Sequence, residues 1–192
     1  NLLVNPAFES AVSVGFLPTA PGNWRGDVAV SVGAERGITP RSAPNMLRFD
    51  FTGDVASTNT FASQQWQIVD VNALAADIAA GRVRADASAW FNRVVGDLTT
   101  DRRFDIRVLA FNVAAADLPA AYVAGTQLAV QFASIQTTGN AWQQAALNMI
   151  LPAGTRLLLV EIYAFEDVVN DATPPEFAGH YADDISLVLT RN

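Results

Sequence analysis

Short runs in which apolar and polar residues alternate recur along the 192-residue chain and constrain its fold more than any other feature. In the run LRFDF (Leu47–Phe51), for example, apolar and charged side chains alternate without exception. This period of two places one set of side chains on each face of a β-strand. Gly, Pro, Asn and Asp residues separate the runs, as they do between the strands of an antiparallel sheet.

Helical patterns are scarce. One short helix is predicted where Asn72 precedes the run ALAADIAA as an N-cap and Gly81 provides a left-handed stop. The apolar segment 113–124 contains Pro119, which favours a long hairpin connection over a helix. About nine or ten short strands with one short helix predict an all-β fold, an antiparallel jelly-roll β-sandwich. The length predicts that residues 1–192 form a single domain.

The composition excludes several classes of function. The net charge is −7, all 12 basic residues are Arg, and no basic cluster is present to bind a nucleic acid. The absence of Cys excludes disulfides, thiol catalysis and Cys-based zinc sites. The longest strongly apolar stretch, Leu157–Phe165, is too short for a membrane span and contains Glu161.

Catalytic motifs are missing as well. The single histidine, His180, lies in an acidic, Pro-rich region, and no serine has the pattern of a nucleophile elbow. No glycine-rich phosphate loop occurs. Glu161 lies inside an apolar strand, but no second carboxylate identifies itself as its partner in a glycosidase pair. The sequence therefore predicts a protein that is not an enzyme.

The two ends of the chain carry a resemblance. The start NLLVNPAFES and the finish YADDISLVL, with PGNW and LPAGTRLLLVEI between them, resemble the galactose-binding-like β-sandwich superfamily, which includes several families of carbohydrate-binding modules. The resemblance implies non-catalytic binding of a polysaccharide or glycan outside the cell. The chain begins with Asn1 instead of Met, which is expected if a signal peptide has been removed or if the sequence has been trimmed, and we favour the first.

The resemblance also implies a structural calcium ion where the first and last strands meet. Carried over to this chain, its carboxylate ligands are Glu9 and Asp183. In a regular strand Asp183 shares a face with Ile185 and Leu187, and a charge there needs a partner or a metal. The alternative is that Asp183 caps a turn and Glu9 is solvated.

A sugar site is expected to combine an aromatic platform with planar polar side chains. If Leu158, Val160 and Ile162 face the core, the alternate residues of the same strand face outward onto the sheet. Polar side chains of neighbouring strands could join them: Arg48, Asp50, Gln65 and Gln67. Trp66 shares the parity of Ile68, which predicts burial. The predicted ligand-binding residues are Trp24, Arg107, Glu161 and Tyr163. An ordinary solvated sheet face, covered in part by segment 113–124, is the alternative.

A structural role remains open. A largely apolar sandwich could be a self-assembling extracellular subunit of a filament or surface layer, joined by edge strands or by donation of Asn1–Asn5 to a neighbour. If Asn1–Asn5 pairs within its own chain, a binding module is favoured. The acidic loop 166–180 could bind a second calcium, line the ligand site or contact another subunit.

Overall fold

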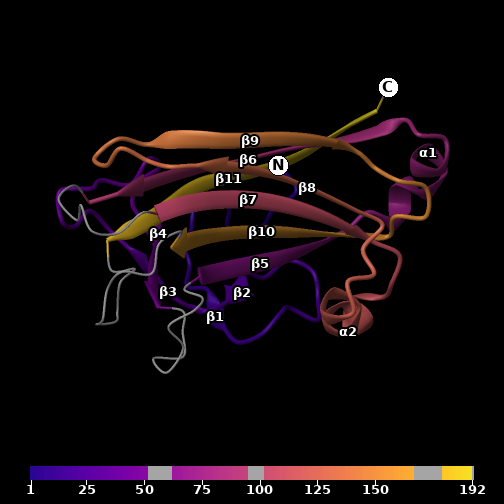
Figure 1. Cartoon of the computed structure of the whole chain (residues 1–192), viewed down its shortest axis with the longest axis horizontal. Helices are drawn as coiled ribbons and strands as arrows, with labels where there is room; N and C mark the ends of the chain where they lie inside the picture. The colour runs from indigo at the N-terminus through magenta and orange to yellow at the C-terminus, as the bar shows by residue number, and fades with distance from the viewer. Residues whose placement is uncertain (52–61, 95–101, 167–178, 192) are drawn as a thin grey trace.

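The chain forms two facing β-sheets in a computed structural model that describes residues 1–51, 62–94, 102–166 and 179–191 (Figure 1). Sheet A contains, in spatial order, β1 (Ser13–Val14), β2 (Arg25–Gly26), β5 (Ala62–Asp70), β10 (Leu157–Glu166), β7 (Arg102–Phe111) and β8 (Ala129–Ile135). Sheet B contains β3 (Val28–Val32), β4 (Met46–Phe51), β11 (His180–Arg191), β6 (Val83–Arg93) and β9 (Gln143–Ile150). The paired strands of the described residues are antiparallel, except for β1 with β2. The predicted all-β sandwich is confirmed.

The core lies between the sheets and follows the alternation of the sequence. Every second residue of β10 points inward and is 0 % exposed: Leu158, Val160, Ile162 and Ala164. Phe104 of β7 stacks on Phe91 of β6 with ring centroids 5.0 Å apart, so the two sheets contact directly through aromatic rings. The other residues of β10 therefore face away from the core, as predicted.

Two helical segments occur where one was predicted. The first consists of a 3-10 turn (Asn72–Leu74) and α1 (Ala75–Ala79), and Gly81 ends it with a φ of 68°. Asn72 is not its N-cap, which corrects the prediction, because the Asn72 side chain bonds Asp70 and Arg156 instead.

The second helical segment corrects the expected hairpin connection at 113–124. A 3-10 turn (Ala115–Asp117) leads into α2 (Leu118–Val123), and Pro119 lies in the first turn, where its missing N–H costs nothing. Leu118 and Ala121 pack on the outer face of sheet A. Figure 1 shows α1 and α2 at the same end of the sandwich. Among the described residues, no helix has the length and apolar character needed to cross a membrane.

The N-terminal segment is bound to its own chain. The Leu2 N–H donates to the Leu187 carbonyl at 2.8 Å. The buried Gln67 side chain accepts from the Val4 N–H at 2.8 Å and donates to the Val4 carbonyl at 2.9 Å. Asn1–Asn5 is thus held between β11 of one sheet and β5 of the other, which is the arrangement expected of a self-contained binding module.

A bulge near the start of β11 changes the parity of that strand. The pairing of β11 with β6 shifts between Asp183 and Ser186, and Asp184 has a φ of 49°. Ala182 and Ile185 both face the core, so Asp183 faces outward, toward the segment before β4. The expectation that Asp183 shares the face of Ile185 and Leu187 is therefore wrong.

Candidate functional site

The outer face of sheet A carries a row of polar and aromatic side chains that crosses four strands. The strand register places Arg25 of β2 opposite Trp66 of β5, Trp66 opposite Glu161 of β10, and Glu161 opposite Arg107 of β7. We call these four residues the cross-strand row. Phe132 of the edge strand β8, opposite Arg107, extends it on one side and is 61 % exposed. Together with Phe132, the row spans the four strand spacings from β2 to β8, or roughly 19 Å.

A second set of residues lies beside the row, two positions farther along the same strands. Tyr163 of β10 is opposite Asp105 of β7. The Arg107 guanidinium lies 4.4 Å from the Tyr163 ring centroid and the Arg103 guanidinium 4.6 Å from that of Phe165. The buried Asp105 carboxylate accepts hydrogen bonds from both arginines, at 3.1 and 3.5 Å. Asp105 thereby helps to hold two guanidinium groups over aromatic rings.

The cross-strand row contains polar atoms that the protein leaves without partners. Within the described residues, Arg25 Nε, Trp66 Nε1, Arg107 Nε and both carboxylate oxygens of Glu161 are buried and make no hydrogen bond. Buried polar atoms are almost always hydrogen-bonded, and leaving one without a partner costs about 1–3 kcal/mol. The row therefore contains donors on either side of an acceptor, and the hydroxyl groups of a ligand can form the hydrogen bonds that these atoms lack.

The ionisation of Glu161 reflects this environment. Burial raises the pKa of Glu161 from 4.5 to about 7, while the positive charge of Arg107 lowers it. The Trp66 indole and the Tyr122 hydroxyl lie close enough to lower this pKa further, but neither completes a hydrogen bond of acceptable geometry. Glu161 is therefore a carboxyl group that lies near hydrogen-bond donors but accepts no hydrogen bond from them.

Access to the row is restricted. Glu161 is 1 % exposed and Tyr163 is 3 % exposed, so their predicted outward orientation is confirmed but their ready accessibility is not. Tyr122 approaches from α2, with its ring centroid 6.5 Å from that of Trp66, and Arg107 lies over Tyr163. Both covering side chains are half-buried. The Glu161 oxygens are themselves buried, so contact with a ligand requires side chains around them to move.

Trp24 does not belong to this site. It is 3 % exposed, packs against Phe8 with ring centroids 5.4 Å apart, and donates its indole N–H to the Asn5 carbonyl. Its ring helps to hold the N-terminal turn in the core. The prediction that Trp24 forms a ligand platform is therefore wrong.

The other polar residues expected on this face lie elsewhere. Gln65 and Gln67 are 0 % exposed and point inward, where they bind backbone groups of the N-terminal region. Arg48 and Asp50 belong to β4 of sheet B, where Arg48 also pairs with Glu35. Of the residues predicted to bind a ligand, the structure brings together Arg107, Glu161 and Tyr163.

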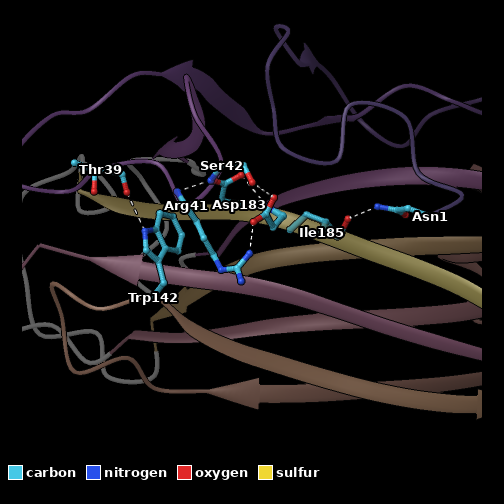
Figure 2. A network of polar contacts seen from close by, with 8 residues as sticks. Asn1, Thr39, Arg41, Ser42, Trp142, Asp183 and Ile185 are labelled. Carbon is cyan, nitrogen blue, oxygen red and sulfur yellow. Dashed lines mark hydrogen bonds and ion pairs between the residues drawn. The ribbon is translucent and has the colours of Figure 1, made fainter.

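The two predicted calcium ligands do not fit a shared metal site. The Arg41 and Ser42 N–H groups donate to Asp183 Oδ2 at 2.8 and 2.9 Å, and the Asp184 N–H donates to Oδ1 at 2.8 Å (Figure 2). N–H donors aimed at a carboxylate take the positions that a cation would need. Glu9 is exposed and faces Asn45 at 3.4 Å. The described residues contain no group of three or more acidic or histidine side chains suited to a metal. The calcium site remains a prediction, which a chelation experiment can test.

A shallow groove on the opposite face is a weaker candidate. It has a volume of about 380 Å³ on the outer face of sheet B and is lined by residues of β6, β9 and β11, among them Ser88, Gln144 and Ser186. No lining residue carries a buried, unpartnered polar atom. The groove therefore lacks the feature that distinguishes the outer face of sheet A.

Sequence reasoning missed several members of the site. Trp66 was expected to be buried, which is correct, but its burial is on the outer face beneath Tyr122. Arg25 gave no signal because β2 is only two residues long. Phe132 does alternate with inward-facing residues in the run AVQFASI, and this parity could have identified it. The acidic loop 166–180 lies largely outside the described residues; its last residue, His180, is buried against Phe104.

Comparisons with known proteins agree on the fold. No protein-family model and no curated protein sequence matches the chain. Among solved structures, a family 61 carbohydrate-binding module in complex with β-1,4-galactotriose is 15% identical, with a TM-score of 0.55 over 100% of this chain and 99% of that one. The xylan-binding CBM22-2 domain of Paenibacillus barcinonensis Xyn10C is 18% identical, with a TM-score of 0.51 over 91% and 94% of the chains. A family 16 carbohydrate-binding module is 14% identical, with a TM-score of 0.51 over 98% and 99%. The chain therefore shares the β-sandwich fold of these carbohydrate-binding modules, and the fold that the resemblance of its two ends implied is confirmed.

Proposed function

We propose that the protein is a non-catalytic module that binds a polysaccharide through the outer face of sheet A. The observation that carries the proposal is the cross-strand row, in which buried donors and a carboxylate lack partners beside aromatic rings. Sugar hydroxyls donate and accept at once, so they complement such a row, and sugar C–H faces pack on rings. The resemblance of the two ends to secreted domains of this fold supports a function outside the cell.

Exposed aromatic side chains at both ends of the row support a chain-like ligand. Phe16 is 55 % exposed and contacts Trp66 edge to face, with centroids 6.2 Å apart. Phe132 is 61 % exposed at the other end, 5.8 Å from the Arg107 guanidinium. Two exposed rings on either side of the row suit several sugar units of a polymer better than a single sugar.

The alternative is a self-assembling subunit. It requires an edge or a terminal strand that a neighbour can complete, and Asn1–Asn5 is instead bound to β5 and β11 of its own chain. This pairing favours the binding module. Sedimentation of the purified protein at increasing concentration tests the alternative, which predicts growing assemblies.

A glycan array followed by calorimetry with Phe132→Ala tests the proposed function. We expect the substitution to weaken binding about fivefold, or about 1 kcal/mol, without lowering stability, because the ring is exposed. Ile150→Ala is the matched control: Ile150 is 51 % exposed at the end of β9, the edge strand of sheet B. Equal affinity in the wild type and the Phe132 variant would place the binding surface elsewhere.

A further inference from the structure

Few groups around Glu161 stabilise the negative charge of its carboxylate. Glu161 is faced by Trp66 from β5, Arg107 and Asp105 from β7, and Tyr122 from α2. Arg107 is the one cation in this set, and Asp105 adds a second negative charge that raises the pKa of Glu161.

The compensating cation is itself divided. Arg107 Nη2 lies 3.5 Å from Asp105, and the Arg107 guanidinium lies over the Tyr163 ring, so its charge and its donors are only partly directed at Glu161. The nearby donors Arg107 Nε and Trp66 Nε1 form no hydrogen bond with Glu161 or with any other group of the described residues. The ionised carboxylate therefore accepts no hydrogen bond from the described residues, and the hydroxyl groups of a ligand can supply the missing donors.

We propose that binding of a hydroxyl-bearing glycan at the cross-strand row is coupled to ionisation of Glu161, so that the ligand is held at neutral pH and released on acidification. The inference rests on the proposed function. Hydroxyl groups that donate to a charged carboxylate form stronger hydrogen bonds than those that donate to a neutral acid. Glu161 is already 1 % exposed, so a covering ligand adds almost no further desolvation that would favour the protonated form.

The linkage fixes the sign and size of the effect. Burial sets the pKa of Glu161 at about 7 in the free protein, and a ligand that prefers the carboxylate lowers it. Affinity is then nearly constant above that value and falls by up to about tenfold for each pH unit below it. Binding near pH 6 releases close to one proton per site.

Isothermal titration calorimetry of the full chain tests the coupling. The probes are β-1,4-galactotriose and xylohexaose, measured between pH 5 and pH 8 in pairs of buffers that differ in ionisation enthalpy, which gives the number of protons released. Glu161→Gln keeps the size of the side chain and removes the titration. Asp27→Asn is the matched control, since Asp27 follows β2 in sheet A, lies outside the row, and has a pKa that burial raises to about 6. Circular dichroism confirms that both variants fold.

Each result decides the inference. Weaker binding in acid with proton release, lost in Glu161→Gln and kept in Asp27→Asn, supports it. Binding that does not vary with pH, tightens in acid, or keeps its pH dependence in Glu161→Gln overturns the coupling while the proposed function stands. Absence of binding by either probe at pH 8 overturns the coupling together with the proposed function for these glycans. In a second measurement, the carboxyl ¹³C signal of Glu161 should titrate near pH 7 in the free protein and lower with probe bound.

Discussion

Two buried carboxylates, one on the outer face of each sheet, differ in what surrounds them. Asp183 of sheet B is 0 % exposed and accepts hydrogen bonds from the backbone N–H groups of Arg41, Ser42 and Asp184. Glu161 of sheet A is 1 % exposed and has no hydrogen-bond partner in the described residues. The fold satisfies the first carboxylate from within, and this marks it as structural. The second accepts no hydrogen bond from the described residues, and it is the carboxylate for which we propose an external ligand.

Removal of the Asp183 carboxylate should have the largest effect on stability. Asp183→Ala leaves three backbone donors of the Arg41–Ser42 turn and the β11 bulge without an acceptor, and we expect a loss of about 4 kcal/mol in the free energy of unfolding. Urea denaturation monitored by circular dichroism measures it. Asp183→Asn keeps one acceptor oxygen and should lose about half as much. A loss below about 1 kcal/mol in the Ala variant would show that water replaces the carboxylate and that Asp183 is not structural.

Removal of the Glu161 charge should raise the stability of the protein at pH 8, whereas removal of the Asp183 carboxylate lowers it. Because burial raises the pKa of Glu161 from 4.5 to about 7, the folded state holds a proton that the unfolded state gives up between these values. Stability from this group is therefore present below about pH 4.5 and is lost as the pH rises to about 7, by about 3 kcal/mol in total. Glu161→Gln should remove this part of the pH dependence and be relatively more stable at pH 8.

Urea denaturation of the wild type and Glu161→Gln at several pH values isolates the contribution. Asp27 and Asp183 also have pKa values that burial raises, to about 6, so the wild-type curve alone does not identify Glu161. The difference between the two proteins cancels those shared terms. Parallel stability curves would mean that Glu161 finds its donors within the protein, and the contrast with Asp183 would disappear.

The sequence predicted the alternation of the strands well because a period of two is a local property. The inward residues of β10 and the outward orientation of Glu161 and Tyr163 follow from that period alone. The resemblance of the two termini added the sandwich. The alternative interpretation of the outer face included its partial covering by segment 113–124, and the packing of Leu118 and Ala121 confirms that covering. Local patterns could not show that the segment is helical, since Pro119 is compatible with both a turn and a helix start.

The failures share a physical cause, which is the placement of segments far apart in the chain. Trp24 looks like a loop residue until the N-terminal turn closes over it, with Phe8 as its neighbour. Asp183 looks like a core-facing residue until a bulge shifts the parity of β11. The bulge depends on the pairing with β6 and on the positive φ of Asp184. Neither can be recognised from the alternation of residues within β11.

Chelation of calcium should have the smallest effect on stability. It is the last test of the contrast between Asp183 and Glu161. A calcium site at Asp183 would have to displace the N–H donors of Arg41 and Ser42, so we expect EGTA to shift the melting temperature by less than about 1 °C. A site with a Kd one hundredth of the free calcium concentration would instead stabilise the protein by about 2.7 kcal/mol. For a chain of this length such a gain corresponds to roughly 5–10 °C. A shift of that size, abolished in Glu9→Gln, would restore the calcium prediction and make Asp183 a metal ligand. A shift that Glu9→Gln retains would place a calcium ion at another part of the chain and leave the roles of Asp183 and Glu161 as the hydrogen bonds assign them.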